Sequence, residues 1–310
     1  MGNQQMCCQI DPTDEKLKAE NVLLATSTAP NSNSFTQSTS SQPHSYLTDS
    51  LGREELPRGR LDLAGPGQKP RDKLVSKTQR DSRWMVSYSD GSNYFGDLQN
   101  DQRHGLGQLI MPNGDIFSGH FVQDRIEGLG EFTALDGFCY SGEWVNGLFE
   151  GEGYQVSPDG RSYKGSYLAG KQHGKGVMLT TRGDCYEGDF INGIIEGQGK
   201  FTSKKGVNYF GQWRNNKREG YGELFTSKFT YSGEFRANKI EGEGYMKYID
   251  GREYIGSFKN GEPHGKGRIT LPCGLIRSGF WENGRLLSTS VHPELLEPSF
   301  FWRPDNEMHV

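Results

Sequence analysis

The chain has 310 residues and a formal net charge of −4, with 33% hydrophobic residues, 43 glycines, 17 Phe, 14 Tyr and 5 Trp. Glycine costs a helix about 1 kcal/mol relative to alanine and aromatic residues favour strands, so this composition predicts short strands joined by tight turns. The acidic balance argues against nucleic-acid binding. No apolar run approaches the roughly 20 residues of a membrane-spanning helix, and no secretory signal peptide is expected.

Residues 1–83 show no regular pattern and are predicted to be a disordered region that ends in a linker. The stretch 26–50 is dense in Ser, Thr, Asn and Gln. It has too little apolar surface to offset the entropy that ordering would cost. Residues 58–83 are mildly basic with interspersed Pro and Gly, which is typical of a linker.

The first eight residues resemble the start of a doubly acylated protein. The chain begins Met-Gly-Asn, which is similar to a myristoylation signal on Gly2, and Cys7 and Cys8 offer acceptors for palmitate. Met6 departs from the usual motif, which has Ser or Thr there. One myristoyl chain binds membranes only weakly, so palmitate on a cysteine is the expected second anchor. The alternative is an ordinary disordered start without lipid.

An internal repeat begins at Tyr94. Eight blocks start with an aromatic residue every 23 residues, except after Tyr209, where the step is 22. Half-blocks flank them at 84–91 and 278–284. The blocks read YFGDLQNDQRHGLG, FSGHFVQDRIEGLG, YSGEWVNGLFEGEG, YKGSYLAGKQHGKG, YEGDFINGIIEGQG, YFGQWRNNKREGYG, YSGEFRANKIEGEG and YIGSFKNGEPHGKG.

Side-chain alternation along a strand places the first, third and fifth residues of each block on one face. The first and fifth are aromatic apart from Leu98, and the third is always Gly, which leaves room for neighbouring rings to lie across its backbone. Mostly polar second and fourth residues predict a solvated opposite face. The expected aromatic face comprises Tyr94, Phe117, Tyr140, Trp144, Tyr163, Tyr167, Tyr186, Phe190, Tyr209, Trp213, Tyr231, Phe235, Tyr254, Phe258 and Trp281.

Each block is predicted to be one β-hairpin. A turn follows the first strand, often Asn-Gly as at Asn146-Gly147, and a second turn closes the block, often Asp-Gly as at Asp136-Gly137. A lone hairpin is marginal in water, so neighbouring blocks must share their aromatic faces. The Gly-x-Gly pairs recur inside a strand pattern instead of opening a helix, which argues against phosphate loops.

The pattern Tyr-x-Gly-x-Trp/Phe, then Gly-x-Gly, then Asp-Gly at 23-residue spacing resembles the MORN repeat family. The resemblance covers residues 84–284 and implies an all-β fold, an elongated, twisted antiparallel sheet of tandem hairpins. With the half-blocks, about 17 strands are expected, on the order of 80 Å at ~4.8 Å per strand. Residues 285–310 are expected to form a C-terminal cap or tail, with an apolar stretch that includes Trp302.

The turns of several blocks carry apolar residues where much of the family has Lys-Arg-His. Contiguous exposed apolar groups mark interaction sites more often than chance. The alternative is that these side chains pack on the adjacent hairpin. The candidate partner-binding residues are Ile126, Leu148, Phe149, Ile194, Ile195 and Ile240.

Neither a metal site nor a cofactor is expected. His104, His173 and His264 precede the Gly-x-Gly pair in three blocks and Glu precedes it in the other five, so these residues are spread one per repeat along the array. They are expected to satisfy turn backbone groups or neighbouring side chains. Five cysteines, odd in number and mostly far apart, argue against a disulfide framework and favour the cytosol.

The resemblance implies a non-catalytic scaffold, because MORN arrays occur in membrane tethers, ciliary radial spokes and cytoskeletal scaffolds. The regions flanking the array are too short and polar for the catalytic domains that follow some MORN arrays. The sequence therefore predicts a scaffold at the cytosolic face of a membrane that binds cytoskeletal or ciliary proteins. The alternatives are a phosphoinositide-binding module and a regulatory subunit of a lipid kinase, and a homodimer is a further option because an open sheet has two edges.

Overall fold

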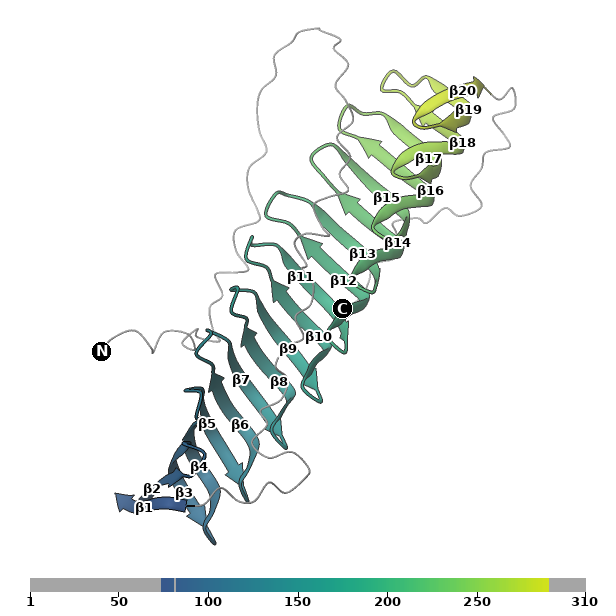
Figure 1. Ribbon diagram of the computed structural model, residues 1–310. Coiled ribbons are helices and arrows are strands. Elements are labelled where there is room, and N and C mark those ends of the chain that lie inside the picture. Colours follow the sequence, from purple (N-terminus) through teal and green to yellow (C-terminus); the bar gives the residue numbers. More distant parts are fainter. Residues whose placement is uncertain (1–73, 81, 290–310) are drawn as a thin grey trace.

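The computed structural model describes residues 74–80 and 82–289, which form one long, twisted antiparallel sheet (Figure 1). Each strand pairs with its neighbours in the sequence, so the chain advances along the sheet one hairpin at a time. The described ranges contain twenty strands and no helix. The predicted all-β fold of tandem hairpins is confirmed. Twenty strands at ~4.8 Å span on the order of 90 Å.

The first ten strands are β1 (Leu74–Arg80), β2 (Arg83–Tyr88), β3 (Asn93–Gln99), β4 (Gln102–Ile110), β5 (Ile116–Val122), β6 (Arg125–Thr133), β7 (Cys139–Val145), β8 (Leu148–Val156), β9 (Ser162–Leu168) and β10 (Lys171–Leu179). The next ten are β11 (Cys185–Ile191), β12 (Ile194–Thr202), β13 (Asn208–Arg214), β14 (Lys217–Phe225), β15 (Phe229–Arg236), β16 (Lys239–Tyr248), β17 (Glu253–Lys259), β18 (Glu262–Thr270), β19 (Ile276–Glu282) and β20 (Arg285–Thr289).

The sheet extends one strand beyond the predicted array at each end. β1 lies in the region expected to be disordered, and that expectation is wrong for residues 74–80. β1 lacks the aromatic-glycine pattern, but it supplies backbone partners to the edge of β2, and Lys77 Nζ lies 4.2 Å from the Trp84 ring centroid. At the other end β20 places Leu286 opposite Trp281. The remainder of the expected cap, residues 290–310, lies outside the described residues.

The tyrosine that opens a block lies across two glycines. A Cβ added to Gly142 or Gly153 would lie 2.6 or 2.5 Å from the Tyr140 hydroxyl, so neither site has room for a side chain. Tyr140 Oη donates a hydrogen bond to the Glu143 carbonyl oxygen at 3.0 Å. Burial raises the pKa of Tyr140 above its ordinary value, which keeps the phenol protonated and able to donate. This arrangement explains the earlier glycine and the second glycine of Gly-x-Gly, whereas the first, Gly151, has a positive φ of 56°.

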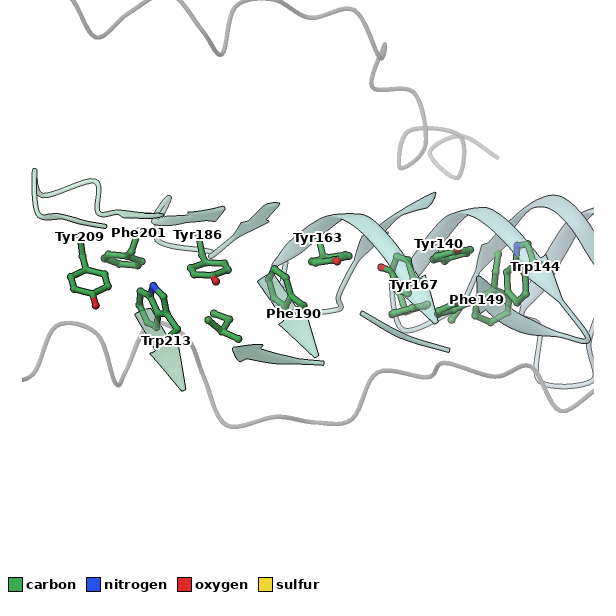
Figure 2. Close-up of a cluster of buried hydrophobic side chains, with 14 of the residues drawn as sticks. Tyr140, Trp144, Phe149, Tyr163, Tyr167, Tyr186, Phe190, Phe201, Tyr209 and Trp213 are labelled. Carbon is green, nitrogen blue, oxygen red and sulfur yellow. The ribbon is translucent and has the colours of Figure 1, made fainter. Parts of the chain in front are cut away.

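Aromatic rings form one continuous row along the core face of the sheet (Figure 2). All fifteen residues of the expected aromatic face are buried. Trp144 makes T-shaped contacts with Phe117 of the preceding block and Tyr140 of its own, at centroid distances of 5.2 and 5.1 Å. Its Nε1 donates to the Gly130 carbonyl oxygen at 3.0 Å. Each repeat is therefore completed by rings from its neighbour.

The loops between hairpins lie along one long edge of the sheet, which we call the loop edge. Here carboxylates link successive loops: Asp115 accepts the N–H of Leu135, and Asp184 accepts the N–H of Lys204, both at 3.0 Å. Both aspartates are buried. The loops therefore stack on one another in addition to the pairing of the strands.

Candidate protein-binding surface

The hairpin turns lie along the opposite edge of the sheet, which we call the tip edge. Each turn has two residues, and in the third block these are Asn146 and Gly147, with φ of 51° and 74°. Positive φ at both positions is the conformation of the hairpin turns that match the right-handed twist of paired strands. The residues on either side of each turn are held directly opposite each other, as Val145 and Leu148 are.

Most of the turns form two hydrogen bonds with the preceding repeat. The Gly147 N–H donates to the Ile126 carbonyl oxygen at 3.1 Å, and the Asn146 N–H donates to the Glu127 carboxylate at 3.2 Å. The same carboxylate bond recurs in the pairs Glu150–Ala169, Glu196–Asn215, Glu219–Ala237 and Glu241–Asn260. The prediction that these glutamates satisfy turn backbone groups is confirmed. These hydrogen bonds therefore join the turns of successive repeats along the tip edge.

Three repeats have histidine at the position of these glutamates. The Nδ1 atoms of His104, His173 and His264 are buried and have no hydrogen-bond partner among the described residues. They lie in different repeats, and no group of three potential metal ligands occurs within residues 74–80 and 82–289. A hollow of about 380 Å³ at the tips is lined partly by Glu219 and Glu241, but both carboxylates already accept turn N–H groups.

Apolar side chains follow one another along the middle of the tip edge. They come from the residues that flank the turns, and the most exposed of them, Leu168 and Ile191, are each 47% exposed. Together they form a stripe over four consecutive hairpins, which we call the apolar edge. The apolar edge comprises Val122, Val145, Leu148, Leu168, Ile191 and Ile194.

The structure divides the six predicted partner-binding residues into two groups. Leu148 and Ile194 are partly exposed and belong to the apolar edge. Ile126, Phe149, Ile195 and Ile240 are buried in the core, so for these four the partner-binding prediction is wrong and the alternative of packing holds.

Alternation from the turn explains the division. The residue directly after the turn faces outward, and the next one faces the aromatic row, where Phe149 stacks 3.7 Å from Tyr140. The same reasoning would have identified the four residues that the sequence analysis missed, namely Val122, Val145, Leu168 and Ile191. The residue before each turn lies directly opposite the residue after it, so the two share one face of the sheet, and this relation would have predicted the additional residues.

The remaining predicted site residues are cysteines and the N-terminal glycine. Cys139 is buried, Cys185 is half-buried and Cys273 is exposed, and the three form no disulfide with one another. Gly2, Cys7 and Cys8 lie outside the described residues. Within the described part of the chain, no helix is long and apolar enough to cross a membrane.

Comparison with known proteins gives a family but no close relative. The MORN repeat model matches eight segments: 94–116, 117–137, 140–160, 163–185, 186–207, 209–227, 231–251 and 254–272. A search of curated proteins finds no match.

Some solved structures show distant similarity. The TCP10 domain of Danio rerio CPAP, in complex with a STIL peptide, is 15% identical over 66% of this chain and 99% of its own, with a TM-score of 0.33. The Drosophila melanogaster SAS-4 TCP domain, in complex with a proline-rich motif of Ana2, is 12% identical over 71% of this chain and 100% of its own, with a TM-score of 0.17. Staphylococcus aureus virginiamycin B lyase is 10% identical over 68% of this chain and 88% of its own, and its TM-score is also 0.17. These TM-scores are too low to show a shared fold.

The family assignment therefore rests on the repeat matches, which cover more than half of the chain. MORN repeats are generally non-catalytic modules of the scaffold or binding type, and no enzyme family is indicated. Sequence pattern, strand pairing and matched segments all agree on the same eight blocks. This chain belongs to the MORN repeat family.

Proposed function

We propose that this protein is a scaffold that binds a partner protein along its apolar edge and is held at a membrane by acyl groups on its N-terminal region. The observation that carries the first part is the row of partly exposed aliphatic side chains over four hairpins, including Leu168 and Ile191. Exposed apolar side chains gathered on one part of a surface are typical of interaction sites, and here Arg125 and Lys171 lie opposite Val122 and Leu168 within the row.

The spacing of the apolar edge suits a helical partner. Successive hairpins are two strands apart, so equivalent tip residues recur about every 9.6 Å. Seven residues of an α-helix rise about 10.5 Å. A helix lying along the edge would therefore meet one hairpin with one apolar residue in each heptad. Long heptad helices are common in cytoskeletal and ciliary proteins, the partner class that we propose.

Charge on the apolar edge should weaken partner binding. We expect Leu168→Asp with Ile191→Asp to weaken binding at least about tenfold, because that factor needs only ~1.4 kcal/mol and each aspartate would be desolvated by the partner. Proximity labelling in cells would identify proteins near the wild-type chain. Binding of the recovered partner to the purified variants would then be measured directly.

The control changes Val177 and Leu179 to Asp, because these aliphatic residues of β10 are similarly exposed but lie away from the hairpin tips, in the half of the strand next to the loop edge. Binding lost equally in both variants would refute this site. Sedimentation tests whether the apolar edge binds a second copy of this chain. If the wild type and the control are dimers and the apolar-edge variant is a monomer, the apolar edge is a homodimer interface instead.

The membrane part of the proposal is supported by the residues Gly2, Cys7 and Cys8. We expect mass spectrometry of the N-terminal peptide to find myristate on Gly2 and palmitate on a cysteine. Gly2→Ala should move the chain to the soluble fraction, whereas Cys7→Ser with Cys8→Ser should leave a weak, rapidly exchanging anchor, since one myristoyl chain binds with K on the order of 10⁴ M⁻¹.

An unmodified N-terminal peptide in membrane-bound protein would contradict acylation. Binding of the Gly2→Ala form to phosphoinositide vesicles would then favour the first alternative, a lipid-binding array. Stoichiometric recovery of a lipid kinase would favour the second, a regulatory subunit. In our proposal the protein lies at the cytosolic face of a membrane, next to the cytoskeleton or a cilium.

A further inference from the structure

The face of the sheet opposite the aromatic row, which we call the outer face, carries an exposed aromatic pair. Phe210 of β13 and Phe225 of β14 meet in a T-shaped contact at 6.2 Å and are 43% and 39% exposed. The positions equivalent to Phe210 hold Ser118, Ser141 and Ser232 in three other repeats. The folding of the array therefore does not require a phenylalanine at this position.

One lysine contacts this pair, and two more lie in the adjoining loops. Lys200 lies directly opposite Phe210 in the strand register, and its Nζ is 5.3 Å from the ring centroid. Phe225 is the last residue of β14 and leads into the loop that contains the exposed Lys228. The preceding loop contributes the exposed Lys204, whose side chain crosses the loop before it: a Cβ added to Gly183 would lie 3.3 Å from Lys204 Cδ.

The local charge balance is positive although the whole chain carries −4. Two carboxylates share this part of the outer face, Glu187 opposite Lys200 and Glu223 opposite Phe210. Neither forms an ion pair with a lysine or arginine among the described residues. Asp184 is buried and its carboxylate already accepts a hydrogen bond from the Lys204 backbone N–H, so we do not count it among the carboxylates exposed on this face.

We propose that this surface binds an acidic, extended segment of a partner protein that carries an apolar anchor residue. The surface, which we call the lysine–aromatic patch, comprises Lys200, Lys204, Phe210, Phe225 and Lys228. The ring pair offers apolar area to the anchor, and the lysines complement carboxylates on either side of it. The interleaved Glu187 and Glu223 repel a continuous polyanion, whereas spaced acidic side chains can avoid them.

The lysine–aromatic patch is separate from the apolar edge. The patch lies on the outer face next to the loop edge, whereas the apolar edge follows the hairpin tips at the opposite ends of the strands. The two surfaces can therefore be occupied together. A scaffold with two such surfaces would bring a heptad helix and an acidic segment to the same array.

The test uses the full-length chain and defined probes. The fluorescein-labelled peptide Glu-Asp-Glu-Phe-Glu-Asp-Leu-Glu is titrated and its anisotropy is measured. We expect saturable binding that weakens as salt increases, and at least about tenfold weaker binding for Lys200→Glu with Lys204→Glu and Lys228→Glu. Phe210→Ser alone should also weaken binding. The control triple variant, Lys164→Glu with Lys217→Glu and Lys259→Glu, changes net charge equally but lies outside the patch, and it should bind as the wild type does.

Several outcomes would overturn the proposal. These are no binding of the acidic peptide, equal binding of a peptide with Lys in place of each acid, or equal losses in both triple variants. Tighter binding of single-stranded RNA, or of phosphatidylcholine vesicles containing phosphatidylserine, with the same dependence on the patch lysines would assign it to those polyanions instead. Full retention of binding in Phe210→Ser would remove the anchor from the proposal and so refute it.

Discussion

Replacement of Trp144 by alanine is expected to destabilise the middle of the array by about 3–5 kcal/mol while its ends remain folded. Trp144 is fully buried and contacts rings of its own repeat and of the preceding one. Because each repeat contacts only its neighbours, the loss should stay local. Hydrogen exchange should therefore accelerate in β5–β9 far more than in β15–β17.

Phenylalanine at the same position provides the control. Four other repeats carry Phe there, namely Phe121, Phe190, Phe235 and Phe258, and all are buried. Trp144→Phe removes the hydrogen bond to Gly130 but keeps a ring in place, so we expect a loss of only about 1 kcal/mol. Equal acceleration of exchange along the whole sheet in Trp144→Ala would show that the array unfolds as one unit and that the neighbour-only description is wrong.

The repeated positions explain why the core was predictable from sequence. Tyr140, Gly142 and Trp144 alternate with polar residues, and alternation in a strand assigns them to one face without further information. The same spacing in every block then fixes the direction in which the sheet grows. The Tyr140 ring over Gly142 and Gly153 is the physical reason for the glycines, and it matches the space that the sequence pattern required.

The surface was less predictable because its features lie outside the shared pattern. Phe149 and Leu148 are adjacent and both apolar, yet one is buried and the other partly exposed, since a shift of one residue changes the face. The Phe210–Phe225 pair joins residues on two strands, and only the register brings them together. β1 has no aromatic pattern at all and is ordered by the strand beside it.

One core residue departs from the pattern. Arg218 occupies the site that Ile126, Phe149, Ile195 and Ile240 fill in other repeats, and it is buried between the rings of Tyr209 and Phe235, 5.5 and 5.1 Å from their centroids. Burial lowers the pKa of Arg218 to about 10, so the guanidinium remains charged at neutral pH. Its Nη2 donates to the Asn238 carbonyl oxygen at 2.6 Å, but its Nε has no partner among the described residues.

We expect Arg218→Ile to stabilise the protein by about 1–4 kcal/mol, raising the midpoint of urea unfolding. A buried charge without a counter-ion is unfavourable, and apolar replacements of buried ionic groups are often stabilising by this amount. The variant loses one hydrogen bond and two ring contacts. These losses are smaller than the relief of the desolvated charge, and three other repeats already accommodate isoleucine at this site.

Arg103 shows what a carboxylate partner would contribute at the site of Arg218. It holds the equivalent position, and its Nε lies 3.1 Å from the Asp124 carboxylate, whereas Arg218 meets Asn238 there. Asn238→Asp should therefore also stabilise the array, because it restores that ion pair. Arg103→Ile should have the opposite effect and lower the unfolding midpoint, since it leaves Asp124 without its cation. If Arg218→Ile and Arg103→Ile destabilise equally, then the rings around Arg218 compensate its charge fully, and the account of an unfavourable buried cation is wrong.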